Sequence, residues 1–207
     1  MKVLIQLSIA IAMLVGCVNV MADAHSRTLS SDVFALGRIK IGVTTIAEAQ
    51  EILGKTVSFR SRKVDESPVQ ICYLAESPNV RFYVLFEAGS MGGFSRITRF
   101  SISRQAPSQS CGSLRSPAEV MSSGNGVKIG QSYQEFLSKF SVRFTSVGDK
   151  LIYRAQTSRS PNAEELIVLK KAWPEEKAYR LEVLVNINAD FENGFLSKYE
   201  VSRIESY

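Results

Sequence analysis

The side chains that most often carry out enzyme chemistry are scarce in this chain of 207 residues. Its one histidine, His25, lies near the N-terminus, so the rest of the chain offers no histidine for a catalytic triad or a metal site. The sequence also contains no glycine-rich phosphate-binding loop of the type that precedes a lysine. These residues predict a protein that is not an enzyme and that needs no cofactor or metal.

Paired carboxylates are the remaining candidates for catalysis, because two of them can hydrolyse a glycosidic bond. The candidate pairs are Glu164 with Glu165, Glu175 with Glu176, and Asp190 with Glu192. Each pair falls in or beside an expected loop or hairpin end, where a solvated charge is the usual reason for an acidic residue. A carboxylate-based cell-wall hydrolase therefore stays as an alternative. The segment 190–194 could also hold a cation, but its Asn-Gly pair favours a hairpin turn.

The N-terminus has the pattern of a signal peptide. Lys2 precedes an apolar run that ends near Val15, which is too short to span a bilayer. Residues 14–17, Leu-Val-Gly-Cys, resemble a lipobox; cleavage there would remove residues 1–16, leave Cys17 to carry a lipid and make residues 17–30 a tether. Cleavage after residue 22 or 24 is the alternative. We expect a periplasmic protein, either anchored to the outer membrane by its lipid or freely soluble.

Cys72 and Cys111 are the cysteines left in the folded part of the chain. An even pair in an oxidising compartment predicts a disulfide, with two free thiols as the alternative. The net charge of +5 is modest and scattered along the sequence. It is typical of ordinary solvation and predicts no nucleic-acid partner.

Internal self-similarity is the strongest pattern in the sequence. Residues 81–104 align with residues 180–203 without gaps, with five identities and with apolar residues opposite apolar residues elsewhere. Upstream, Ile-Lys-Ile-Gly at 39–42 matches Val-Lys-Ile-Gly at 127–130. A capping box follows each glycine, Thr45 with Glu48 and Ser132 with Glu135, and an apolar helical spacing follows each box.

The expected fold class is therefore α+β, made of two tandem α-α-β-β-β-β units. A short helix is expected at residues 31–36 and another from residue 116, each ahead of the capped helix. Strands are expected at 56–62, 69–75, 80–88 and 96–104, and again at 151–156, 166–172, 179–189 and 195–204. The units span residues 31–104 and 116–207, and residues 105–115 link them.

The alternation of side chains in the expected strands predicts one face of each sheet covered by helices and one left open. Apolar residues such as Phe82, Val84, Leu181 and Val183 should face the helices. We expect a protein partner to bind the open face, through the residues that point away from the helices at matched positions of the two units: Arg81, Tyr83, Leu85, Arg180, Glu182 and Leu184. Trp173 is a weaker candidate for a contact residue.

Two tandem units of this kind resemble the β-lactamase-inhibitor-protein-like fold. The glycine, capped apolar helix and closing glycine at Gly42, Thr45 and Gly54 also resemble the repeat of the small outer-membrane assembly lipoproteins of the SmpA/OmlA group. The second unit matches this pattern with Gly130 and Ser132. The first unit has one extra residue before its helix cap, and the second has Ser141 where the closing glycine is expected.

The resemblance implies a function by protein–protein contact. We expect an exported envelope protein of the inhibitor or immunity type, with an outer-membrane assembly scaffold as the alternative. A ligand held between sheet and helices would need a large apolar cavity. The bulky residues expected to face the helices predict a filled core instead.

Overall fold

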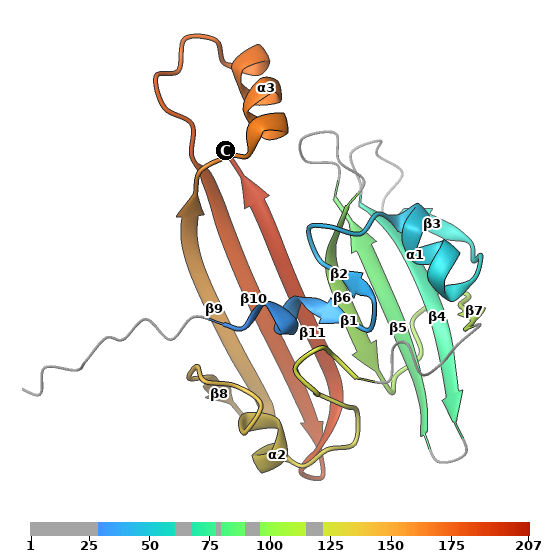
Figure 1. The fold of residues 1–207 in the computed structure, drawn as a ribbon. Helices are drawn as coiled ribbons and strands as arrows, with labels where there is room; N and C mark the ends of the chain where they lie inside the picture. The colour runs from blue at the N-terminus through green and yellow to red at the C-terminus, as the bar shows by residue number, and fades with distance from the viewer. Residues whose placement is uncertain (1–28, 61–67, 78–79, 90–95, 115–121) are drawn as a thin grey trace, which may run out of the picture.

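The computed structural model describes residues 29–60, 68–77, 80–89, 96–114 and 122–207, and shows a mixed α+β chain dominated by strands (Figure 1). These residues form three α-helices, a two-stranded sheet and a nine-stranded, largely antiparallel sheet. The order in the large sheet is β3-β4-β5-β6-β11-β10-β9-β8, and β7 runs parallel to β4 at its edge. The predicted signal peptide and tether, and the helix predicted from residue 116, fall mainly or wholly outside the described residues.

The described elements fall into two consecutive parts of the chain. The first part contains the 3₁₀-helix η1 (Ser31–Phe34), β1 (Ala35–Leu36), β2 (Ile39–Lys40), α1 (Ile46–Leu53), β3 (Ser58–Arg60), β4 (Val69–Ser77), β5 (Val80–Ala88), β6 (Ile97–Ser103) and β7 (Gly112–Ser113). The second part contains α2 (Tyr133–Leu137), β8 (Thr145–Val147), β9 (Lys150–Arg159), α3 (Ala163–Ala172), β10 (Leu181–Glu192) and β11 (Phe195–Ser206).

The centre of the large sheet is the junction of β6 with β11. It comprises five residue pairs, from Lys198 opposite Ser103 to Ser202 opposite Arg99. Beyond Ser202, β11 continues to Ser206 and pairs with β10 alone among the described residues. The two strands therefore part at this end of the sheet, which is the top of Figure 1.

Alternating burial along β5 and β10 confirms the predicted faces. Val84 of β5 is fully buried and Leu181 of β10 is 2% exposed. The residues that alternate with the buried ones along each strand are half-buried or exposed. Figure 1 shows η1, β1, β2 and α1 in front of the sheet, on the face that carries the core. Phe136 of α2 packs edge-on against Tyr199 on this same face. Burial of these aromatic side chains together with the aliphatic residues of the core stabilises the fold.

The capped helices form where the sequence predicts them. Thr45 accepts a hydrogen bond from the backbone N–H of Glu48, whose carboxylate accepts one from Thr45 in return. Ser132 and Glu135 make the same reciprocal pair at α2. The second helix ends after five residues, earlier than the apolar spacing to residue 140 predicts.

Two predicted elements are different in the structure. The sequence predicts a strand at residues 166–172, because Leu166 is followed by the β-branched Ile167 and Val168, but these residues lie in α3. Asn162 caps this helix and Glu165 completes a capping box, so local hydrogen bonding outweighs the strand propensity of these residues. The first short helix is a single 3₁₀ turn, and its expected last residues form β1 instead.

Cys72 and Cys111 lie at disulfide-bonding distance, as predicted, with their Cα atoms 4.6 Å apart. Cys72 is on β4, and Cys111 immediately precedes β7, which pairs with β4 at Tyr73. The bond therefore fixes the segment after β6 to the far edge of the sheet.

Candidate functional site

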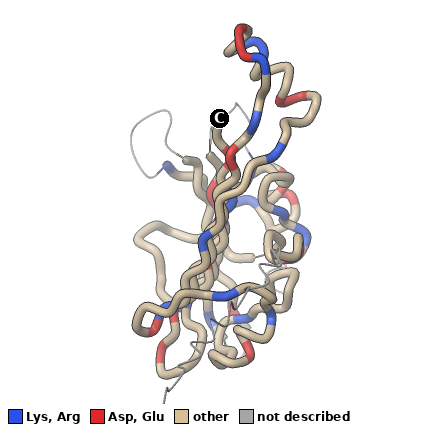
Figure 2. Tube along the Cα trace, turned by 90° about the vertical axis from the view of Figure 1, so that its left-hand side faces the viewer, with Lys and Arg blue, Asp and Glu red and all other residues tan. Residues whose placement is uncertain are grey.

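The face of the large sheet opposite the core is the first candidate site, and we call it the open face. Strand register places Leu85 of β5, Ser101 of β6 and Glu200 of β11 in one row on this face. Figure 2 turns the sheet nearly edge-on, so that the front of Figure 1 lies on the right and the open face on the left. Side chains on the open face are mostly polar, as expected for a sheet surface outside the core.

The six residues predicted to bind a partner lie in two separate corners of the open face. Tyr83 pairs with Ser103, so its corner is at the end of the sheet where β6 stops. Leu184 pairs with Ile204, close to the opposite end of β11. β6 and β11 lie between β5 and β10, so the two corners are also about 14 Å apart across the strands. The structure brings each trio together, but it does not join the two trios into one patch.

The two corners differ in exposure. Leu184 is 40% exposed, and the neighbouring Glu182 and Gln156 are exposed and hydrogen-bonded to each other at 3.1 Å. Tyr83 and Leu85 are less exposed than Leu184, since both are half-buried. The Arg81 guanidinium lies 5.9 Å from the centre of the Tyr83 ring. The Leu184 corner is therefore the more accessible apolar point of the open face.

Paired charges occupy the middle of the open face. Arg99 lies 3.6 Å from Glu87 and 4.0 Å from Glu200, and Lys198 lies 3.6 Å from Glu200. These groups neutralise one another across three adjacent strands. A partner would meet a polar centre with little net charge rather than a strongly charged patch.

A pocket of about 500 Å³ lies at the other candidate site, where β6 and β11 part. Its first wall comes from residues 41–43, 68, 87, 89, 96 and 98, and its second from residues 159, 162, 165, 181, 203–205 and 207. Its volume is in the range of pockets that bind small molecules or short peptide segments. The sequence analysis did not predict a pocket.

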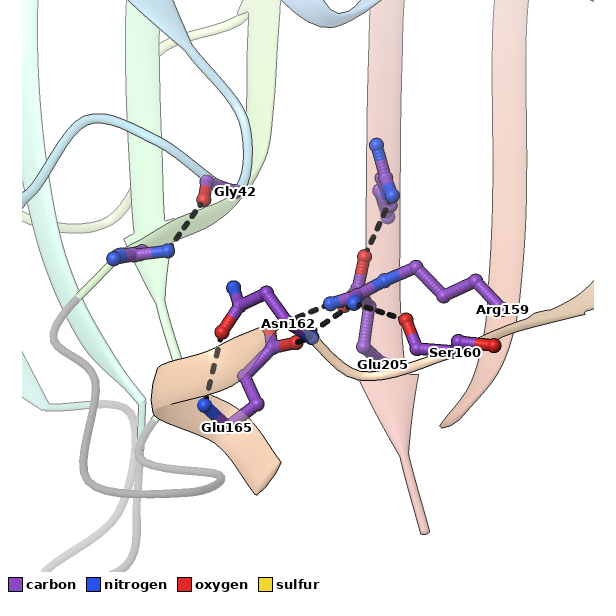
Figure 3. Close-up of polar contacts among 8 residues, drawn as sticks. Gly42, Arg159, Ser160, Asn162, Glu165 and Glu205 are labelled. Carbon is purple, nitrogen blue, oxygen red and sulfur yellow. Dashed lines mark hydrogen bonds and ion pairs between the residues drawn. The ribbon is translucent and has the colours of Figure 1, made fainter. Parts of the chain in front are cut away.

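An ionic network crosses the second wall of the pocket (Figure 3). Arg159 donates two hydrogen bonds to the carboxylate of Glu165, at 2.7 and 2.6 Å, and further hydrogen bonds to Glu205. Arg203 pairs with the other oxygen of Glu205 at 2.7 Å. The network fastens α3, which carries Glu165, to the ends of β9 and β11.

The network changes the acidity of its members. Hydrogen bonds from Arg159 hold the pKa of Glu165 below its ordinary value, with help from the Asn162 backbone N–H and the charge of Arg96. The hydrogen bond to Glu165 likewise raises the pKa of Arg159. Glu165 therefore stays ionised, whereas the acid of a glycosidase needs a raised pKa.

Of the other candidates singled out in the sequence, Glu175 and Glu176 are exposed in the loop after α3, and the segment 190–194 forms the end of a hairpin. Asp190 lies 3.7 Å from Lys150. Asn193 and Gly194 have φ values of 53° and 82°, as an Asn-Gly hairpin turn requires. No group of three or more metal-ligating side chains gathers among the described residues. Trp173 is 49% exposed and packs edge-on against Tyr207, with their ring centres 5.2 Å apart.

The pocket could not be predicted because its second wall depends on α3. Arg159 and Glu165 are six residues apart, and the expected strand at 166–172 would have placed them in different surroundings. The capping pattern of Asn162 with Glu165 is the signal that could have revealed the helix.

Comparison with known proteins gives no relative for this chain: no family model, no curated protein and no solved structure matches it. Among the described residues, no helix is both long enough and apolar enough to cross a bilayer.

Proposed function

We propose that this chain is a non-enzymatic, exported envelope protein that binds a protein partner through the open face. The observation that carries the proposal is the two-sided character of the large sheet. One side buries the core under helices and loops, and the other presents rows of polar side chains with Leu184 exposed among them. Protein-binding surfaces are about as polar as the rest of a protein surface, so a large, mostly polar sheet face left uncovered by helices is suited to binding a partner.

The size of the open face supports a stable complex. The eight strands of the main path have between 3 and 12 residues. With a rise of about 3.3 Å per residue and a spacing of about 4.8 Å between strands, together they present on the order of 1,000 Å². A stable protein–protein interface needs about 800 Å² from each partner. One partner domain could therefore cover most of the face.

We also propose that the chain arose by duplication of one α/β unit. The strand order supports this, because β3-β4-β5-β6 is followed by the reversed series β11-β10-β9-β8. Hydrogen bonds of matching loops support it as well. Gly42 N–H donates to the Ile97 carbonyl at 2.8 Å, and Gly130 N–H donates to the Leu196 carbonyl at 2.8 Å.

A second pair of matching contacts involves the irregular points of the two central hairpins. Thr98 donates a hydrogen bond from its hydroxyl to the Glu87 carbonyl at 3.3 Å, and Ser197 does the same to the Asp190 carbonyl at 3.1 Å. Both hydroxyls lie beside the register shift of their hairpin. Helix α3 has no counterpart among the described residues of the first unit.

The inhibitor or immunity type is our preferred role, on the strength of the resemblance in architecture to the β-lactamase-inhibitor-protein-like fold. The apolar N-terminal run supports export. The Cys72–Cys111 pair is consistent with an oxidising compartment such as the periplasm. Lipid attachment at Cys17 would add an anchor to the outer membrane.

Variants of the open face test the proposal. We would replace Leu184 with Glu and, separately, Tyr83 with Glu in the affinity-tagged protein. The matched control is Ile167→Glu, which places the same charge at a residue of α3 that is 70% exposed. Each protein is purified from its own cell envelope, the co-purifying proteins are quantified by mass spectrometry, and the main partner is then titrated against each variant by calorimetry.

We expect Leu184→Glu to weaken binding of the partner by about tenfold or more, because a buried charge without a partner is costly at an interface. Ile167→Glu should bind as the wild type does. Equal affinity of all three variants would reject the open face as the binding surface. Hydrolysis of peptidoglycan by the wild type, lost in Glu165→Gln, would instead establish the enzyme alternative.

A further inference from the structure

We propose that the pocket between β6 and β11 is a second binding site, which takes an extended, uncharged peptide segment as an added strand next to β11. The site is distinct from the open-face surface of the proposed function and does not depend on it. Three observations carry the inference: the one-sided pairing of β11, the position of the pocket in the plane of the sheet, and the balance of charge in its walls.

The end of β11 has a hydrogen-bonding edge without a strand partner among the described residues. Arg203 to Ser206 pair with β10 from Val185 to Glu182, while the pairing with β6 stops at Ser202. In a strand, successive backbone groups point to opposite sides. Register with β6 makes Arg203 and Glu205 the residues that face the pocket side. The Arg203 N–H lies at the end of the pairing with β6, so the Arg203 C=O and both the N–H and C=O of Glu205 are the groups that point toward the pocket. Such an edge is a template for a further strand.

The pocket lies in the plane of the sheet rather than on one of its faces. Arg203 and Glu205, which line it, point to the face that carries the core. Glu87 and Ile204, which also line it, point to the open face. A space bordered by side chains of both faces occupies the position that the next strand of the sheet would take.

The far side of this space is a turn that is hydrogen-bonded to the start of β6. Ile97 N–H donates to the Thr44 carbonyl at 2.8 Å, and Gly42 N–H donates to the Ile97 carbonyl at 2.8 Å. Residues 42–44 thus pair with the start of β6 and form the wall opposite β11. A short peptide would lie between this segment and β11.

The charges in the pocket indicate the type of peptide. Among the residues that line it, three arginines stand against three glutamates: Arg96, Arg159, Arg203, Glu87, Glu165 and Glu205. The walls therefore favour neither an acidic nor a basic ligand. The apolar side chains of Val43, Ile204 and Tyr207 are at least partly exposed at the pocket and could contact apolar residues of the peptide.

Gly89 provides a way to block the pocket. A Cβ atom built on Gly89 would lie 3.7 Å from the Thr98 side chain, an ordinary contact distance, so a larger residue is tolerated at this wall. Gly89→Phe would put an aromatic ring where the peptide should enter. The control is Val147→Phe on β8, a residue that is 56% exposed and pairs with Lys150 at the opposite end of the sheet.

The probe is a phage-displayed library of random linear decapeptides, selected on the purified wild-type protein. The affinity of the recovered peptides is measured by calorimetry for the wild type, Gly89→Phe, Val147→Phe and Tyr83→Glu. Amide hydrogen exchange of residues 203–206 is followed by NMR with and without peptide. Circular dichroism checks that each variant is folded.

We expect peptides without net charge whose affinity falls by about tenfold or more in Gly89→Phe and is unchanged in the other two variants. Binding should depend little on salt, and the amide of Glu205 should exchange quickly in the free protein and slowly in the complex. Failure to recover any peptide, equal binding to folded Gly89→Phe, or slow exchange of the Glu205 amide in the free protein would overturn the proposal. Loss of binding in Tyr83→Glu would also overturn it, because Tyr83 lies on the open face at the opposite end of the sheet and the peptide would then occupy that face.

Discussion

Two buried tyrosines have hydroxyl groups in different situations. The Tyr73 hydroxyl donates a hydrogen bond to the Gly54 carbonyl at 2.7 Å, directly after α1. The Tyr199 hydroxyl makes no well-formed hydrogen bond to a described residue. Burial raises the pKa of both, that of Tyr73 to about 12, so neither ionises near neutral pH. Apolar burial of the two side chains therefore stabilises the fold to a similar extent, but the hydrogen bonding of their hydroxyl groups differs.

Removal of the two hydroxyls should therefore have different effects on the free energy of unfolding. We expect Tyr73→Phe to lower it by about 1–2 kcal/mol, because the Gly54 carbonyl loses its donor in a buried place. Tyr199→Phe should change it by less than about 0.5 kcal/mol or raise it, since a buried polar group without a partner is removed. Urea unfolding of the two variants measures the difference. A larger loss in Tyr199→Phe than in Tyr73→Phe would contradict it.

For single residues, the sequence predicts which face of the sheet most side chains occupy. The alternation of Phe82 and Val84 with Tyr83 and Leu85 is enough to assign each side chain to a face, because the strand geometry is local. The polar partners are less predictable. The contact of Tyr73 with Gly54 joins a strand to the end of a helix, and no spacing in the sequence indicates it.

Helix α3 is attached to the sheet at few points. Leu169 is its buried residue, and the hydrogen bonds of Glu165 to Arg159 provide a polar attachment. Ile167, Trp173 and their neighbours on the same segment are exposed. The stability of this element should therefore depend strongly on the ionic network, and so on pH.

The pKa direction of Glu165 fixes the sign of that dependence. Because the folded pKa lies below the unfolded value of about 4.3, the ionised carboxylate stabilises the folded state at neutral pH. This stabilisation is lost as the pH falls through the folded pKa. We expect Glu165→Gln to cost about 1–2 kcal/mol at pH 7 and much less near pH 3. Denaturant unfolding at the two pH values measures it.

The control for this prediction is the adjacent acid. Glu164→Gln makes the same change of charge on the same turn of α3 at an exposed residue, and should alter stability by less than about 0.5 kcal/mol at either pH. Equal effects of the two substitutions at pH 7 would show that the network does not hold the helix.

The helices show why element type is predictable only where the local signals agree. At Thr45 and Ser132, the capping box and the apolar spacing point to the same structure, and the helices form there. In α3, the cap at Asn162 competes with the apolar run of Leu166, Ile167 and Val168, which is typical of a strand. The apolar run alone predicts a strand, which is the wrong element. A strand at this place would not bring Glu165 to the pocket, so the sequence does not predict the pocket either.

For the whole molecule, the bond between Cys72 and Cys111 should be a large contributor to stability. It closes a loop with a sequence separation of 39 residues, which corresponds to about 4 kcal/mol in the chain-entropy model. We expect the Cys72→Ala, Cys111→Ala double variant to lose most of that amount in urea unfolding. Strong reductant should lower the stability of the wild type equally and leave the double variant unchanged. Two free thiols in the native wild type would contradict the bond.

Strand order could not be predicted from the sequence. Each hairpin follows from neighbouring runs and turn residues, such as Asn193 and Gly194 between β10 and β11. The pairing of β6 with β11 instead joins Ser103 to Lys198, which are far apart in the chain, and it depends on how the complete units fit together. For this reason the sequence predicts the two trios of open-face residues but not their separation into opposite corners.

The short junction of β6 with β11 has a mechanical consequence. It contains five residue pairs, whereas β10 and β11 share eleven. Tension applied across the strands, from β4 near one edge to β9 near the other, loads the junctions in series, so the junction with the fewest residue pairs should fail first. Under load the sheet should tear along its midline, beginning at the end where the two strands already diverge.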